Sequence, residues 1–253
     1  MSGHSKWAGI KHKKAIIDAK KGKVFTRITR EIVVAAREGG GNPENNSRLR
    51  KAMESAREAN MPVDNVKKAL QRGTGELPGA MYEELMYEGY GPAGVALLVE
   101  ITTDNKNRTA SEVRKIFSSH GGNLGESGCV SWMFTKKGYI GIEKSKSDED
   151  TLMNLVLELG AEDMSTDDDE LFEIFVKPED FETVKKGLEV KNVPIAAAEI
   201  TLQPQTYIKL TGKSAEQMVK LMDGLEEHDD VKNVFANFDI STEDMEAIEA
   251  AQK

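Results

Sequence analysis

The chain changes both its charge and its hydrophobic periodicity near Gly75, and this change constrains its fold more than any other feature. Residues 1–75 contain 17 Lys and Arg and 7 Asp and Glu, a net charge of +10. Residues 76–253 contain 17 Lys and Arg and 36 Asp and Glu, a net charge of −19. This asymmetry indicates a basic module that faces nucleic acid, joined to an acidic body. A basic surface for solubility is the alternative, but solubility would not confine the charge to one module.

The basic module has the apolar spacing of short helices. Apolar residues recur at steps of three and four from Phe25 to Ala35, on one face of a helix that Gly39–Gly41 ends. Asn42–Pro43 predicts the cap and the first turn of a second helix. Asn60–Pro62 separates this helix from a third, short one. We therefore predict a three-helix bundle with a flexible N-terminal arm over residues 1–78.

Beyond Gly75, helical and strand patterns are mixed. From strand 139–143 to strand 195–202 the order is βαββαβ, which is typical of a ferredoxin-like domain. The segments before and after this unit also give the order βαββαβ when they are taken together. They are strand 94–102, helix 106–118, strand 129–135, strand 206–210, a helix around 218–225 and strand 231–240. The predicted fold class is α+β, with two ferredoxin-like domains after the bundle. Residues 136–204 form one, inserted in the other (residues 79–135 and 205–241), and residues 241–253 form a frayed acidic tail.

Several classes of protein are excluded by what the chain lacks. Its apolar runs, such as Val95–Val99, are far shorter than the roughly 20 residues of a membrane span. The single Cys129 excludes an intramolecular disulfide, and the four histidines share no metal-ligand spacing. No nucleophile, base and orienting partner converge. We expect a cytoplasmic, non-enzymatic protein with no catalytic residue, no metal, no cofactor, no small-molecule substrate and no membrane contact.

The basic arm and the three helices hold the candidate binding residues. Lysines neutralise phosphates, and an indole among them can stack on an unpaired base. The predicted nucleic-acid-binding residues in the arm and at the start of the first helix are Lys6, Trp7, Lys11, His12, Lys13, Lys14, Lys20, Lys21 and Lys23. Those on the helices are Arg27, Arg30, Arg48, Arg50, Lys51, Asn65, Lys67, Lys68, Gln71 and Arg72.

A series of motifs, in order along the chain, resembles the YebC/PmpR family. The motifs are Gly3–Trp7, Ile10–Lys14, Lys21–Thr26, Asn60–Asn65, Arg72–Gly75, Tyr87–Pro92, Asp104–Thr109 and Gly121–Phe134. The resemblance implies a cytoplasmic, DNA-binding probable transcriptional regulator with a helical first domain and two α+β domains. It also implies a link to translation, because mitochondrial relatives are translational activators. The motifs begin at Gly3 without an Arg-rich presequence, so we expect a bacterial member.

Two functions follow from these features. The first is a transcriptional regulator whose third helix, from Pro62 to Arg72, reads duplex DNA with side chains such as Asn65 and Gln71. The second is a ribosome-associated translation factor that binds ribosomal RNA and assists difficult translation, such as that of proline-rich segments. Trp7 favours the second function because stacking needs unpaired bases.

Overall fold

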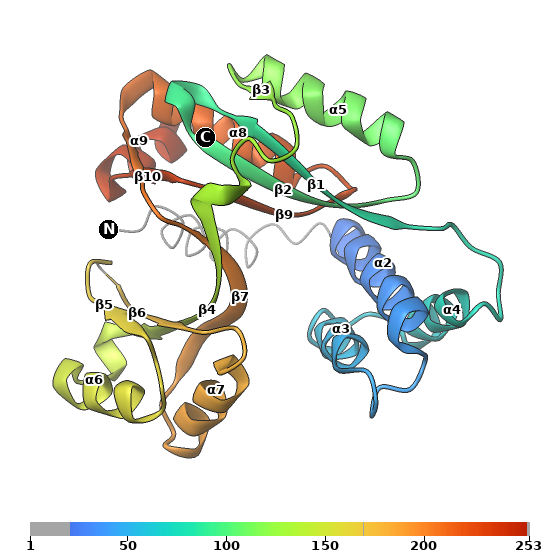
Figure 1. The fold of residues 1–253 in the computed structure, drawn as a ribbon, viewed down its shortest axis with the longest axis horizontal. Helices are drawn as coiled ribbons and strands as arrows, with labels where there is room; N and C mark the ends of the chain where they lie inside the picture. The colour runs from blue at the N-terminus through green and yellow to red at the C-terminus, as the bar shows by residue number, and fades with distance from the viewer. Residues whose placement is uncertain (1–20, 169, 252–253) are drawn as a thin grey trace.

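The computed structural model describes residues 21–168 and 170–251, which form a helical region and two main sheets (Figure 1). In the helical region, Ile32, Leu49 and Ala69 come from three different helices and are buried together. The predicted helices are therefore present. They are α2 (Lys21–Gly39), α3 (Ser47–Glu58) and α4 (Val63–Thr74).

The second helix begins after Asn46, so the prediction of a cap at Asn42 is wrong. The Asn46 side-chain oxygen accepts a hydrogen bond from the Leu49 amide at 3.0 Å. Its amide nitrogen donates to the carbonyls of Ala35, at 2.7 Å, and Gly40, at 2.9 Å. One buried side chain thus satisfies backbone groups at the end of α2 and at the start of α3. Asn42 instead accepts from the Glu44 amide within the preceding turn.

The central sheet has the order β3-β1-β2-β9, with every pair antiparallel. Val99 and Val234 from the sheet pack against Phe117 and Leu221 from two helices that cover one face. The strands are β1 (Glu83–Tyr90), β2 (Ala96–Thr103), β3 (Asn123–Leu124) and β9 (Val231–Ala236). The covering helices are α5 (Lys106–Ser119) and α8 (Gly212–Glu226) (Figure 1).

The second sheet lies between β3 and α8 in the sequence and has the strand order β5-β6-β4-β7. Together with its βαββαβ succession, this is the order of a ferredoxin-like unit, as predicted. Ile140, Ile174 and Leu188 are buried in its core. Its elements are β4 (Phe134–Glu143), α6 (Glu149–Glu158), β5 (Asp163–Ser165), β6 (Leu171–Val176), α7 (Phe181–Val190) and β7 (Ile195–Pro204).

The strand predicted at 206–210 does not join the central sheet. The position beside β2 belongs to β1, which our sequence analysis did not predict. Glutamates at 83, 84 and 88 hide the alternation that would reveal β1 as a strand. The predicted strand is β8 (Ile208–Leu210), which pairs in parallel with β10 (Phe238–Ile240) in a separate two-stranded sheet.

The strand predicted at 129–135 is a loop until Phe134, with a 3-10 turn at Ser131–Met133. Glu88 on β1 explains this difference. Its buried carboxylate accepts hydrogen bonds from the amides of Gly128, at 2.7 Å, and of Val130 and Ser131, both at 2.8 Å. Amides that converge on one carboxylate cannot also pair in a strand ladder.

The prediction of a frayed tail at residues 241–253 is also wrong, because residues 242–251 form a helix, α9 (Thr242–Ala251). The Ser241 hydroxyl accepts a hydrogen bond from the Asp244 amide at 3.1 Å and so caps this helix. Met245 is buried against the central core. None of the helices in the described part of the chain is long and apolar enough to cross a membrane.

The first prediction concerns the crossing of α2 and α4 at Gly73. A Cβ atom at Gly73 would lie 2.6 Å from the Ala36 Cβ and 2.7 Å from the Val33 carbonyl oxygen. We expect Gly73→Ala to lower the free energy of unfolding by about 1–3 kcal/mol, as overpacking does. Gly22→Ala is the control, since a Cβ there would meet no other part of the described structure within 4 Å outside its own helical turn, and alanine favours a helix. Equal stability of both variants in urea unfolding would contradict the close crossing.

Candidate nucleic-acid interface

Three of the predicted binding residues on α2 face the acidic body instead of solvent. Lys23 donates to the Glu227 carbonyl at 2.7 Å, Arg27 to the Glu226 carbonyl and Arg30 to the Asp229 carbonyl. These carbonyls belong to the C-terminal end of α8 and to the loop after it, where a helix carries partial negative charge. The basic face of α2 therefore holds the helical region against the central sheet.

Asp230, which is only 2% exposed, is the centre of this contact. Its Oδ1 lies 2.9 Å from Arg30, and its Oδ2 lies 2.7 Å from Arg108. The hydroxyls of Thr103 and Thr109 also donate to Oδ2, at 2.9 and 2.5 Å. Burial alone would raise the pKa of Asp230, but the hydrogen bonds from Thr109, Arg108 and Thr103 and the charge of Arg30 lower it below its ordinary value.

Arg48 is also engaged within the protein. Its guanidinium forms ion pairs with Glu31 at 2.7 Å, Glu38 at 2.8 Å and Glu84 at 2.6 Å. The hydrogen bond to Glu31 raises the pKa of Arg48, and that to Glu84 adds to the effect. Because Glu84 lies on β1, this cluster forms a second electrostatic link between the helical region and the central sheet.

A group of possible metal ligands lies at the same junction, and its donor atoms are already engaged. Glu112, His228 and Asp230 bring their side-chain donor atoms within 4.8 Å of one another. The His228 Nε2 pairs with Glu112 at 2.9 Å, while its Nδ1 accepts from the Asp230 amide at 3.1 Å. Both ring nitrogens and both Asp230 oxygens are thus used in holding the fold, and the group does not suit a cation.

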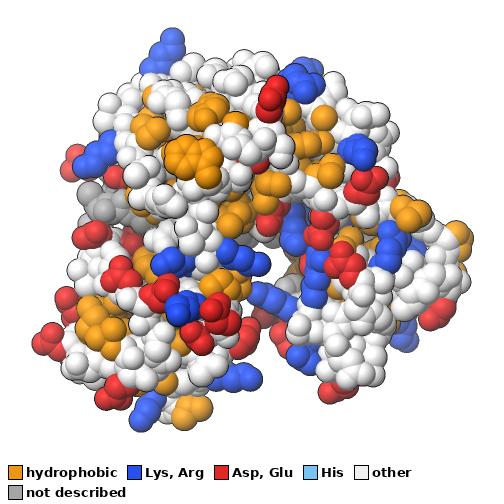
Figure 2. Space-filling model, viewed as in Figure 1, with side chains coloured by type: hydrophobic (Ala, Val, Ile, Leu, Met, Phe, Trp, Pro, Cys, Tyr) orange, Lys and Arg blue, Asp and Glu red, His pale blue; other side chains and the backbone are white. Residues whose placement is uncertain are grey.

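The remaining predicted residues of α3 and α4 are differently placed. Lys51, Lys67, Lys68 and Arg72 are exposed and form no ion pair with any described residue. Arg50 is exposed and donates to the Pro43 carbonyl at 3.1 Å. Figure 2 shows Lys and Arg side chains distributed over the right-hand lobe, which the helical region forms. This outer surface can accept phosphate contacts without breaking an internal ion pair.

The connection between α3 and α4 is a tight turn over residues 59–62. Asn60 adopts a left-handed conformation with φ of 54°, and Met61 is buried beneath the turn. Ala69 and Gly73 face the bundle, whereas Asn65 and Lys68 lie on the exposed side of α4. Helices α3 and α4 thus follow one another with a four-residue turn between them, which is the element order of a helix-turn-helix, and both pack against α2.

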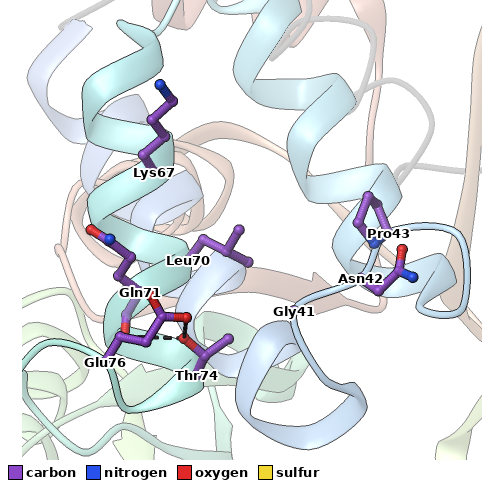
Figure 3. Close-up of a pocket in the computed structure, with 8 residues that line it drawn as sticks. All are labelled: Gly41, Asn42, Pro43, Lys67, Leu70, Gln71, Thr74 and Glu76. Atoms are coloured by element: carbon purple, nitrogen blue, oxygen red, sulfur yellow. Dashed lines mark hydrogen bonds between the residues drawn. The ribbon is translucent and has the colours of Figure 1, made fainter.

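An open pocket of about 600 Å³ lies between α4 and the loop at Gly41–Pro43. Figure 3 shows Leu70 pointing from α4 toward Asn42 and Pro43, with Lys67 one turn away. Lys67 and Gln71, both predicted binding residues, are among the residues that line it. The lining combines the cation of Lys67, the amide of Gln71 and the carboxylate of Glu76 with the apolar side chain of Leu70.

The rest of the predicted site is outside the part of the chain that the structure describes. These residues are Lys6, Trp7, Lys11, His12, Lys13, Lys14 and Lys20, together with the side chain of Lys21.

Family models match this chain in two adjoining segments. The model described as "TACO1/YebC protein N-terminal domain" matches residues 5–76, and "TACO1/YebC second and third domain" matches residues 82–238. The chain belongs to the TACO1/YebC family. The resemblance found in the sequence motifs is therefore confirmed.

Relatives and a solved structure agree with this membership. A protein of Endomicrobium trichonymphae is 64% identical over 99% of this chain and 100% of its own length. One of Dictyoglomus turgidum is 56% identical over 98% and 100%. Both are named "Probable transcriptional regulatory protein". The crystal structure of a conserved hypothetical protein from Aquifex aeolicus is 48% identical, with a TM-score of 0.77, and covers 89% of this chain and 93% of that chain.

Our sequence analysis did not find the residues that orient the helical region in this TACO1/YebC protein. Asp230 and Arg108 are 122 positions apart, so no local spacing connects them. The only available signal was the motif Asp104–Thr109, which supplies Arg108 and Thr109 but does not indicate their partner.

The second prediction uses the lowered pKa of Asp230. A carboxyl whose folded pKa is depressed stabilises the fold above its ordinary pKa, about 4, and loses this contribution as the pH falls through the folded value. Asp230→Asn should lower the free energy of unfolding by on the order of 3 kcal/mol at pH 7, and the difference from wild type should shrink below about pH 4.

The measurement is urea unfolding at several pH values between 7 and 3. Asp150→Asn, which makes the same chemical change at an exposed position, is the control and should give a small difference. A large Asp230→Asn difference that persists unchanged at pH 3 would show that the Asp230 charge does not stabilise the junction.

Proposed function

We propose that this protein is a non-enzymatic, cytoplasmic regulator of transcription that binds duplex DNA through α4 and the basic N-terminal arm. The observation that carries the proposal is the exposed polar face of α4, whose basic side chains form no ion pair with any described residue. Asn65, Lys68 and Arg72 follow one another at helical spacing on its outer side. The names of the bacterial relatives, probable transcriptional regulatory proteins, support the same function.

In this proposal the exposed basic residues of α3 and α4 contact the DNA, and the basic residues engaged with the acidic body have a structural role. Lys67, Lys68 and Arg72 on α4 contact phosphates, and Lys51 on α3 extends the basic surface. Asn65 and Gln71 carry amides, which suit the edge of adenine in the major groove. Arg27, Arg30 and Arg48, which are engaged with the body, act in binding only by holding the helical region in place.

The third prediction tests the phosphate contacts. Changing Lys67, Lys68 and Arg72 to Ala should weaken duplex binding and flatten the slope of log affinity against log salt by about 2.7, at about 0.9 per phosphate. The matched control removes three exposed positive charges elsewhere, at Lys186, Lys191 and Lys209, and should leave the slope unchanged. Fluorescence anisotropy with a labelled duplex at several salt concentrations measures both. Equal slopes in the two variants would remove α4 from the interface.

The fourth prediction tests base reading. Asn65→Ala with Gln71→Ala should abolish the preference for a selected duplex over a random one, because a good bidentate contact discriminates by about 1–3 kcal/mol. Binding selection from a random duplex pool, with wild type and variant in parallel, measures the preference. An equally strong preference in the variant would exclude α4 as the reading helix.

The target itself is tested in the cell. Chromatin enrichment should recover specific promoters, while sedimentation of a lysate through sucrose at moderate salt should leave the protein outside the ribosomal fractions. Co-migration with ribosomes without any enriched promoter would overturn the DNA target and favour ribosomal RNA as the ligand of the same basic surface.

A further inference from the structure

Trp132 is the largest aromatic side chain that the described part of the chain exposes, at 67%. It lies in the turn before β4, in the loop that Glu88 shapes. Its indole N–H donates to the Cys129 carbonyl at 3.1 Å. The one polar atom of the side chain is therefore satisfied within the loop, and what faces solvent is the apolar π surface.

The loop holds this ring in a fixed position. Glu88 binds three backbone amides on the N-terminal side of the tryptophan. On the same side, the Tyr90 hydroxyl donates to the Cys129 carbonyl at 3.1 Å. On the C-terminal side, the Gln205 backbone amide donates to the Met133 carbonyl at 2.9 Å. An aromatic ring that is ordered before binding loses little conformational entropy when a flat partner stacks on it.

Strand β1 connects this loop to the proposed interface. Glu84 of β1 pairs with Arg48 of the helical region, and Glu88 holds the Trp132 loop. Residues four apart on a strand point to the same face, so both attachments lie on one side of the central sheet, roughly 14 Å apart along the strand. Strand β1 thus links the loop of Trp132 to the Arg48 cluster that holds the helical region.

The surroundings of Trp132 suit a nucleic acid better than a second protein chain. Lys136, two residues after Phe134 on β4, is exposed and has no ion pair with any described residue. It lies opposite Leu202, which packs against the same small core as Phe134. A single exposed ring with a nearby cation is too small to bury the roughly 1,200 Å² or more of a stable protein interface, but it matches the stacking platform of a single-strand-binding protein.

We propose that Trp132 is a stacking site for an unpaired nucleobase, presented by the loop that Glu88 organises, and that Lys136 binds the neighbouring phosphate. The inference rests on the proposed function, since it adds a single-strand contact to a protein that binds nucleic acid through α4. Such a site engages the flipped or single-stranded nucleotides next to a duplex. The ligand of Trp132 is an unpaired base, which either DNA or RNA can supply.

The experiment uses the full chain with Trp7→Phe, which leaves Trp132 as its single tryptophan. Unstructured 12-nucleotide DNA and RNA strands, and a duplex of the same sequence, are titrated against tryptophan fluorescence and against anisotropy of the labelled strand. We expect single strands to quench Trp132. Trp132→Ala should weaken single-strand binding by about 5- to 100-fold and duplex binding far less. The relative affinities of the DNA and RNA strands identify the natural source of the base.

Two controls separate stacking from a structural effect. Trp132→Phe keeps an aromatic face and should retain most of the single-strand affinity, whereas Leu157→Ala, which truncates an exposed apolar side chain on α6, should retain all of it. Lys136→Ala should weaken single-strand binding and reduce its dependence on salt. Thermal unfolding confirms that each variant is folded.

Some outcomes overturn the inference while the proposed function stands. If Trp132→Ala binds single strands as wild type does, and the Lys67, Lys68 and Arg72 variant does not, the stacking site is wrong and α4 binding is right. Equal losses for duplex and single strand would also exclude base stacking. A concentration-dependent dimer that Trp132→Ala abolishes, with unchanged strand affinity, would assign the ring to a second copy of the chain. Absence of binding to any nucleic acid would overturn both proposals.

Discussion

The arrangement of this protein depends on one buried carboxylate. Asp230 lies at the start of β9, and its two oxygens accept from an arginine of the helical region, Arg30, and an arginine of the central sheet, Arg108. Removing a carboxylate from water is costly, and two guanidinium groups with two hydroxyls offset that cost. This ion-pair network, together with the Arg48 cluster, fixes how the basic helices sit on the acidic body.

This network changes the meaning of the charge asymmetry in the sequence. A net charge of +10 beside one of −19 suggests a surface for nucleic acid, yet part of it serves the attraction between two halves of the same chain. Lys23, Arg27 and Arg30 bind the end of α8, and Arg48 binds three glutamates. Among the residues of the basic region that the structure describes, the basic side chains left for a partner lie on the outer face of α3 and α4.

The same principle of a buried carboxylate with several donors recurs at Glu88. There the donors are backbone amides, and the result is a turn where the sequence pattern of Val130, Trp132 and Phe134 predicts a strand. Alternation of apolar and polar residues in the sequence predicts a strand. It does not show that a side chain such as the Glu88 carboxylate will accept the hydrogen bonds that a neighbouring strand would otherwise accept. The exception in this loop arises from a polar residue, Glu88, that is buried because it has partners.

The sequence by itself determined the helices of the basic region, the ferredoxin-like succession from β4 to β7 and the family, because these follow from periodicity and from motifs read along the chain. It did not determine that β1 would stand beside β2, that residues 242–251 would form a helix on the central core, or which of the predicted basic residues would be free. Strand β1 pairs with its sequence neighbour β2, and its glutamates hide its strand pattern. Which basic residues are engaged depends, in contrast, on contacts between residues far apart in the sequence, such as Arg30 with Asp230. Only the tertiary structure decides them, because a charge acts on whatever the fold brings within a few ångströms of it.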